Sequence, residues 1–148
     1  MKKLSMLVAL LCILIIPEVH SQVKDLPGDT LKGEWIDESS NCVIKVIEFG
    51  GKYYAEVVGY MLSDSSVIYA QDDNYPNSKY IGIVVFEQCE YENSIWTGKS
   101  RYYDYTTGIR YRYEIEIKEA NKPKRVTVSL RRTFGSNKTT HWTKRDNN

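Results

Sequence analysis

The sequence predicts an all-β fold, a single antiparallel up-and-down β-barrel of about eight to ten strands. Apolar and polar residues alternate along most of the chain, most clearly over residues 109–118, where Ile and Tyr alternate with Arg, Glu and Lys. Short turn signals separate these runs, and no stretch of a dozen residues has the spacing of an amphipathic helix. Many short strands in one small domain pair into a sandwich or close into a barrel. We favour the barrel because closure removes exposed strand edges.

Residues 1–21 predict a cleavable signal peptide. Lys2 and Lys3 precede an apolar run from Leu7 to Ile16, and the small residue Ser21 marks the expected cleavage point. A membrane anchor is disfavoured because the apolar run is several residues shorter than the ~20 that a spanning helix needs. We therefore expect a periplasmic or secreted protein that meets a membrane only transiently during export.

The mature chain predicts one domain with a short approach to it. Residues 22–30 are polar, contain Pro27 and Gly28, and predict a loose lead-in, whereas residues 31–145 predict the barrel. Gly50-Gly51 predicts a two-residue hairpin turn, and Thr106-Thr107-Gly108 predicts another. The expected strands are residues 31–36, 42–49, 53–61, 66–71, 80–88, 94–103, 109–118, 125–132 and 139–144.

The charge of the chain argues against a nucleic-acid partner. The chain has 20 Lys and Arg and 19 Asp and Glu, and the signal peptide holds two of the first group and one of the second, so 18 of each remain. Such a balance gives no overall field that attracts a polyanion. The C-terminal stretch is basic, and we expect its charged side chains, Arg131 and Arg132 among them, mostly on the outward face of strands.

The residues that carry enzyme chemistry are scarce. The mature chain has one histidine, His141, and it has no metal-binding, nucleophile or dinucleotide motif. We therefore predict no catalytic residue, no metal site and no cofactor. Paired carboxylates at Asp72, Asp73 and Asp104 are the remaining enzyme alternative, but they lie in predicted turns, where acids are common.

Aromatic residues are the most distinctive feature, with 12 Tyr against 3 Phe. A tyrosine joins an apolar ring to a hydroxyl that needs a partner when buried. An inward row at Trp96, Tyr102, Tyr111 and Tyr113 would suit a cavity that holds a small amphipathic or apolar molecule. The alternatives are that these rings only fill the barrel, or that the barrel is a scaffold for an envelope protein-interaction module, an inhibitor or surface factor.

Cys42 and Cys89 are the two cysteines of the mature chain. An even number in an oxidising compartment is compatible with a disulfide. Buried free thiols are the ordinary alternative. The sequence leaves both open because it does not show whether the two Cα atoms lie within bridging distance.

Three stretches together resemble the DUF2147 family of bacterial exported proteins, whose function is unknown. They are Gly33-Glu34-Trp35, residues 81–86 and the run from Trp96 to Tyr111, and Trp142-Thr143-Lys144 looks like the terminal W-x-R motif of the family. The chain departs from the family pattern at Lys99, where a second glycine is typical, and at residues 102–105, which lack a proline.

The resemblance implies a lipocalin-like barrel and brings no active site. Gly33-x-Trp35 is also similar to the first-strand motif of lipocalins, in which the tryptophan closes the barrel floor under a basic side chain. The resemblance therefore implies Trp35 and Lys144, or Arg145 in its place, as a barrel-closing pair held by a cation–π contact.

Overall fold

The computed structural model describes residues 27–104, 109–120, 124–132 and 134–146, with side chains described outside 100–104 and 109–111. The predicted signal peptide at 1–21, most of the lead-in and the turn at 106–108 lie outside the described residues. The described elements, in chain order, are η1 (Pro27–Leu31), β1 (Gly33–Asp37), β2 (Cys42–Phe49), β3 (Lys52–Met61), β4 (Val67–Ile68), η2 (Pro76–Tyr80), β5 (Val84–Glu92), β6 (Ile95–Asp104), β7 (Ile109–Glu119), β8 (Arg125–Arg131) and β9 (Lys138–Lys144).

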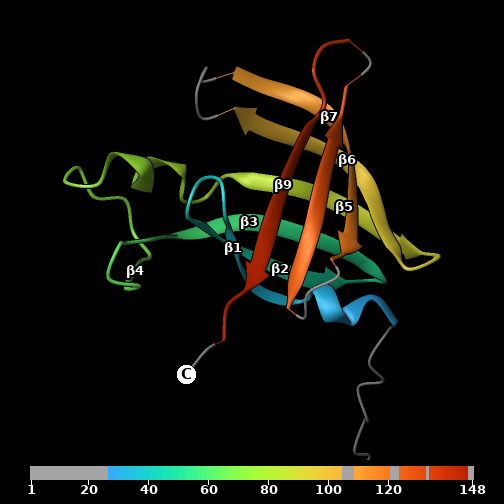
Figure 1. Cartoon of the computed structure of the whole chain (residues 1–148), viewed down its shortest axis with the longest axis horizontal. Helices are drawn as coiled ribbons and strands as arrows, with labels where there is room; N and C mark the ends of the chain where they lie inside the picture. The colour runs from blue at the N-terminus through green and yellow to red at the C-terminus, as the bar shows by residue number, and fades with distance from the viewer. Residues whose placement is uncertain (1–26, 105–108, 121–123, 133, 147–148) are drawn as a thin grey trace, which may run out of the picture.

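The strands form a closed antiparallel barrel, which confirms the predicted fold class (Figure 1). Their order is β2-β1-β9-β8-β7-β6-β5-β3-β4, and a further pairing of β2 with β3 closes eight of them into a ring. The two-residue β4 is an addition on the side of β3. Apart from β4, neighbours in the ring are neighbours in the chain, and β9 returns to pair with β1. This is the up-and-down connectivity that short loops dictate.

Alternation along the strands places the apolar side chains inside. On β7 the side chains of Tyr113, Ile115 and Ile117 are buried, whereas Arg112 and Glu114 on either side of Tyr113 are exposed. Because successive side chains of a strand point to opposite faces, this pattern fixes which face becomes the core. The core contains side chains from each of the eight ring strands.

The hairpin between β2 and β3 turns at Gly50-Gly51 as predicted. Phe49 pairs with Lys52, so these two glycines are the whole turn. Their φ angles are +62° and +79°, a left-handed conformation that glycine adopts without steric cost.

The segment between β3 and β5 departs from the prediction. The strand expected at 66–71 is only two residues long, and the strand expected from Tyr80 begins at Val84. Pro76 instead starts the 3₁₀ segment η2, since proline favours the first turn of a helix. The Ser78 hydroxyl accepts a hydrogen bond from the Asp72 N–H at 2.7 Å and donates to the Asp72 carbonyl at 3.0 Å. These bonds hold the segment as a folded excursion rather than a strand.

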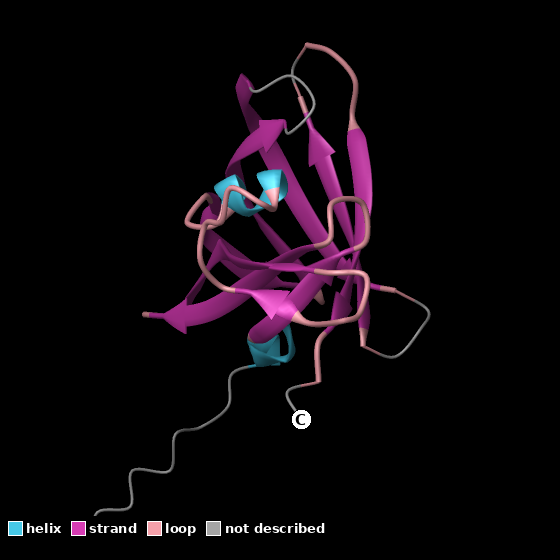
Figure 2. Cartoon of the chain, turned by 90° about the vertical axis from the view of Figure 1, so that its left-hand side faces the viewer, coloured by secondary structure: helices cyan, strands magenta, loops and turns pink. Residues whose placement is uncertain are grey.

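The lead-in is also more ordered than expected. Residues 27–31 form η1, in which Gly28 and Leu31 are buried. Figures 1 and 2 show η1 below the strands, opposite the β8–β9 loop at the top. We call η1 the floor, and we call the opposite end of the barrel, at the β8–β9 loop, the far end.

Candidate functional site

Two tryptophans of the core are bound to the floor by hydrogen bonds. The Trp35 indole N–H donates to the Leu31 carbonyl at 2.7 Å, and the Trp96 indole N–H donates to the Gly28 carbonyl at 3.0 Å. Both side chains are buried. The backbone of η1 therefore supplies the acceptors that these buried donors require.

Further contacts fasten the same segment. The Tyr53 hydroxyl donates to Asp29 Oδ1 at 3.2 Å, and burial together with this carboxylate raises the pKa of Tyr53 to about 12. Lys144 Nζ donates to the Thr30 carbonyl at 2.8 Å and lies 5.0 Å from the centroid of the Trp35 ring. Burial lowers the pKa of Lys144. The structure thus brings together Trp35 and Lys144, the two residues expected to close the barrel.

Trp96 lies at the floor, away from the tyrosine with which it was grouped. Its ring packs against Tyr91 with centroids 4.7 Å apart, and its N–H is already bound to the floor. On the β6–β7 ladder Trp96 pairs with Ile117, four residues from Tyr113, which corresponds to roughly 13 Å along the strand. The predicted ligand residues Trp96 and Tyr113 therefore belong to different ends of the barrel.

At the far end, one row of inward positions crosses several strands. The register pairs Glu87 with Lys99, Lys99 with Glu114, and Glu114 with Arg131. The next positions along β5 and β7, Phe86 and Tyr113, are buried. In this row, which we call the far-end row, lie Phe86 of β5, Tyr113 of β7 and Arg132 just after β8.

Trp142 of β9 faces this row from another wall of the barrel. Its ring lies parallel to Phe86, with centroids 6.4 Å apart and an interplanar angle of 7°. Its exposure is 1 %, the same as that of Trp96, but among the described residues its indole Nε1 has no hydrogen-bond partner. A buried N–H without an acceptor is uncommon in folded proteins and calls for an explanation.

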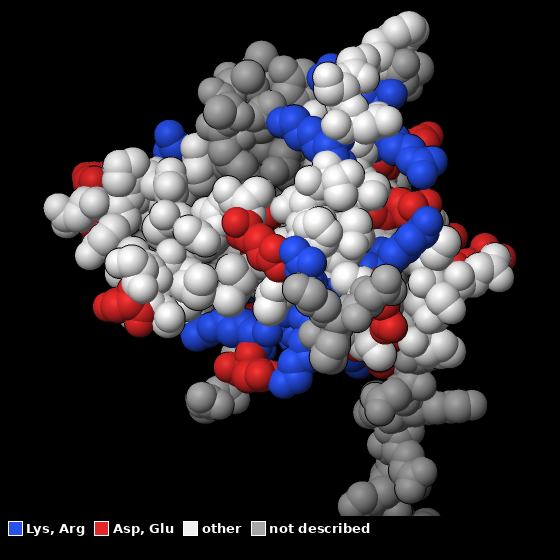
Figure 3. Space-filling model, viewed as in Figure 1, with Lys and Arg blue, Asp and Glu red and all other residues white. Residues whose placement is uncertain are grey.

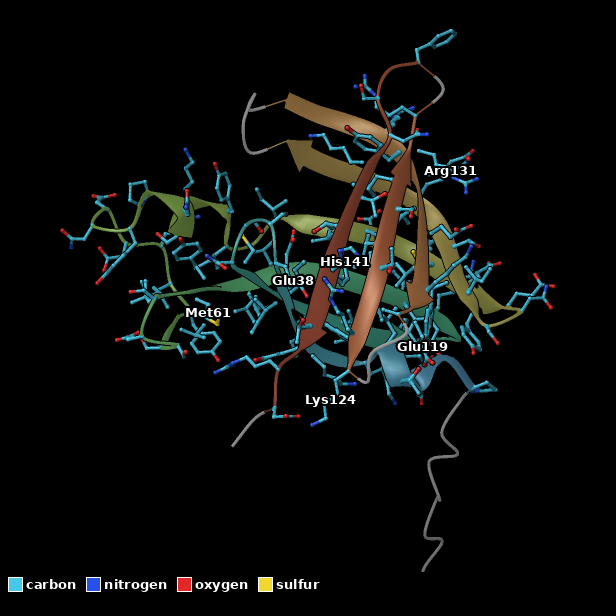
Figure 4. All side chains as sticks on the ribbon, in the orientation of Figure 1. Glu38, Met61, Glu119, Lys124, Arg131 and His141 are labelled. Carbon is cyan, nitrogen blue, oxygen red and sulfur yellow. The ribbon has the colours of Figure 1, made fainter. Side chains whose placement is uncertain are left out.

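Arg132 is the charged member of the far-end row. Its Cζ lies 5.6 Å from the centroid of the buried Tyr113 ring, and its backbone N–H donates to Asn137 Oδ1 at 3.3 Å. Arg132 is half-buried, unlike the exposed Arg131 beside it. Arg131 does lie outward, 3.8 Å from Glu116, and Figure 4 shows it projecting away from β8.

The alternation along β8 indicates on which side of the sheet Arg132 follows the strand. Val126, Val128 and Leu130 are the buried positions of β8, so the next inward position is 132. For Trp142 no comparable signal exists, because its burial is predictable but the absence of an acceptor depends on its three-dimensional surroundings. Tyr102 and Tyr111 pair with each other across β6 and β7, and their side chains lie outside the described residues.

Cys42 and Cys89 are buried and are not joined by a disulfide, so the disulfide alternative is wrong for this structure. Cys42 pairs with Tyr60 of β3 and Cys89 pairs with Tyr53, seven positions away on the same strand. That separation is roughly 20 Å along β3, whereas bridged Cα atoms lie within about 7 Å. Burial raises the pKa of Cys89 to about 12.

Of the carboxylates considered for catalysis, Asp72 stabilises a turn. Asp72 Oδ1 accepts hydrogen bonds from the backbone N–H and the side-chain amide of Asn74, both at 2.9 Å. Asp73 is exposed, and the Asp104 side chain lies outside the described part of the chain.

Among the described residues, His, Cys, Asp and Glu do not gather in groups of three or more that could hold a metal ion. In the same part of the chain, no helix has the length and apolar character needed to cross a membrane.

No family model, curated protein or solved structure matches the chain. The fold and the site therefore define the molecule by themselves. It is a closed antiparallel barrel with a hydrogen-bonded floor at one end. In its interior, the indole N–H of Trp142 has no acceptor among the described residues, and its ring stacks on Phe86.

Proposed function

We propose that the protein binds a small amphipathic molecule inside the barrel, between Trp142 and the far-end row. The observation that carries the proposal is the buried Trp142 indole N–H, which has no partner in the part of the chain that the structure describes. Leaving such a donor unpaired costs about 1–3 kcal/mol. A ligand oxygen at this position would accept the bond and recover that free energy.

The surroundings of this donor favour a ligand with a substantial apolar part. Phe86, Tyr113 and Trp142 are all buried and aromatic, and small-molecule sites are mostly apolar with a few polar groups that fix orientation. Our proposal includes export of the protein to the periplasm or the medium, in line with its predicted signal peptide and its resemblance to the DUF2147 family.

Fluorescence titration of the processed protein against a panel of lipids and aromatic acids tests the proposal. The variant Trp142→Phe should weaken binding roughly fivefold or more, the value of one lost hydrogen bond. Trp35→Phe is the matched control because it makes the same change at the floor, and it should alter the affinity less than about twofold. Failure of all panel members to bind, or equal effects of the two substitutions, would contradict the proposal.

A second candidate function is a protein-interaction module that uses the outer face of the barrel. Ile47 and Phe49 are 50 % and 76 % exposed and lie two residues apart on the outward face of β2. Exposed apolar side chains that adjoin one another favour contact with a partner. If this candidate holds, changing both residues to Ser should abolish capture of an envelope protein that Trp142→Phe still captures.

A further inference from the structure

Asp37 and Trp142 are neighbouring side chains inside the barrel. They pair on the β1–β9 ladder and are 2 % and 1 % exposed, so both lie in the interior. The next pair is Glu38 and His141, both labelled in Figure 4, and the Glu38 N–H donates to the His141 carbonyl at 3.0 Å. Because hydrogen-bonded and non-hydrogen-bonded pairs alternate along an antiparallel ladder, Asp37 and Trp142 form a non-hydrogen-bonded pair. Side chains approach most closely at such pairs, with Cβ atoms about 4.5–5.5 Å apart.

The hydrogen bonds of the Asp37 carboxylate converge on one of its two oxygens. Oδ1 accepts from the Ser39 N–H at 2.9 Å, from the Ser39 hydroxyl at 2.7 Å and from the Thr140 hydroxyl at 2.7 Å. Oδ2 accepts no hydrogen bond from the described residues, and none of their Lys or Arg side chains forms an ion pair with Asp37. A buried carboxylate without a cationic partner is costly unless further donors reach it. The bonds to Oδ1 therefore fix the group and leave Oδ2 for another donor.

The pair presents an acceptor and a donor side by side. Trp142 Nε1 has no acceptor in the described part of the chain, and Asp37 Oδ2 has no donor there. We infer that the ligand carries a hydroxyl group that donates to Asp37 Oδ2 and accepts from Trp142 Nε1, an inference that rests on the proposed function. A hydroxyl has one donor and two acceptor lone pairs, so a single group meets both needs.

Other head groups meet only one of these needs. A carboxylate accepts from Trp142 but repeats the charge of Asp37 at close range, which is unfavourable. An ammonium group donates to Asp37 but has no lone pair for the indole, and an ether oxygen accepts but does not donate. The interior therefore favours an alcohol over an acid, an amine or an ether with the same apolar part.

The charges on the outer surface do not select a charged ligand either. Figure 3 shows Lys and Arg side chains interspersed with Asp and Glu over β8 and β9. Arg125 forms an ion pair with Glu38 at 2.6 Å, and Arg131 lies 3.8 Å from Glu116. A surface on which the two signs are mixed gives no field that concentrates ions of one sign. A neutral head group agrees with this surface.

The test compares two isomers, octanol and heptyl methyl ether, by calorimetric titration of the processed protein. They contain the same atoms, but only the alcohol donates a hydrogen bond. The native protein should bind the alcohol about tenfold more tightly, the value of a hydrogen bond to a charged group. Equal affinity for the two isomers would contradict the inference and would mean that Asp37 and Trp142 hold a water molecule at most.

Asp37→Asn reverses the need of the carboxylate at one atom. The amide keeps an oxygen for Ser39 and Thr140 but places a donor where Oδ2 was, so this variant should bind the two isomers within about twofold of each other. Asp64→Asn is the matched control. Asp64 Oδ1 accepts the same two bonds from the Ser66 N–H and hydroxyl, at 2.9 and 2.6 Å, but its side chain is exposed, so the variant should keep the preference for the alcohol.

Trp142→Phe should weaken binding of both isomers by a similar factor, because both accept from Nε1, and should leave the preference for the alcohol in place. If Asp37→Asn and Asp64→Asn change the preference alike, or if octanol fails to bind while another panel member binds, the inference is wrong and the proposed function stands. If neither isomer nor any member of the wider panel binds, the proposed function itself fails.

Discussion

The three tryptophans of the barrel interior are equally buried but differ in their hydrogen bonds. Trp35 and Trp96, which bind the floor, and Trp142, whose ring stacks on Phe86, are all at most 3 % exposed. The floor gives the first two a backbone carbonyl each, at 2.7 and 3.0 Å, whereas Trp142 has no acceptor among the described residues. Equal burial therefore goes with unequal hydrogen bonding, and the two bonded indoles are the ones that fasten the floor.

The floor closes the barrel by combining a short segment with many partners. Its five residues receive hydrogen bonds from two indoles, a tyrosine hydroxyl and a lysine ammonium. Each of these contacts contributes about 0.5–1.5 kcal/mol net, and together they order a segment too short to be stable alone. Away from the floor, the buried indole of Trp142, which stacks on Phe86, is the group from which we propose ligand binding.

Removing a large ring from the floor should have the largest effect. Trp96→Ala is expected to lower the free energy of unfolding by about 3–5 kcal/mol, because it leaves a cavity and an unpaired Gly28 carbonyl. Urea denaturation of the processed protein measures the change.

The control for that substitution comes from the loop at the far end. Phe134 is 85 % exposed, and Phe134→Ala should change the free energy of unfolding by less than about 0.5 kcal/mol. Similar losses of unfolding free energy in Trp96→Ala and Phe134→Ala would mean that the floor does not contribute more to stability than the β8–β9 loop.

Tyr53→Phe should have an intermediate effect, about 1 kcal/mol, because it removes the hydrogen bond to Asp29. The pKa of Tyr53 is raised from 10.0 to about 12, so its contribution to stability is complete below pH 10 and is lost as the pH rises from 10 towards 12. Between pH 10 and pH 12, the free energy of unfolding should therefore fall less in Tyr53→Phe than in the native protein. Denaturation at pH 9 and pH 11 measures it, and an unchanged slope would argue against the Tyr53 contact.

Glu38→Gln should have the smallest effect, well under 1 kcal/mol, because the side chain is largely exposed and solvent screens its charge. Hydrogen bonds first from Arg125 and then from Thr143 lower the pKa of Glu38 from 4.5 to about 2. Its contribution is therefore present above pH 4.5 and is lost as the pH falls towards 2. Acid titration followed by circular dichroism should show that the variant loses its folded signal less steeply than the native protein as the pH falls. An identical profile for the two proteins would contradict the contribution assigned to Glu38.

Much of this fold could be predicted from local pattern. Strand ends at Cys42, Phe49 and Ile109 were predicted to the residue because alternation and turn residues are encoded in neighbouring positions. The short β4 and the start of β5 at Val84 were not, because the 3₁₀ segment that Pro76 begins extends to Tyr80, where a strand was expected.

The site was less predictable because it depends on register across strands. Tyr113 could be selected for its ring and its inward position, but its neighbours Phe86 and Arg132 come from β5 and from the end of β8. Trp96 was assigned to the ligand site because it is near the tyrosines in sequence, and only the strand pairing separates it from them.

The most direct test of the central claim compares Trp96→Phe with Trp142→Phe by urea denaturation. The two substitutions remove the same atoms at equally buried positions, so the difference between them reports the hydrogen bond. We predict that Trp96→Phe is more destabilising by about 1 kcal/mol or more, because it leaves the Gly28 carbonyl without its donor. A Trp142→Phe variant that loses as much stability as Trp96→Phe would contradict the account.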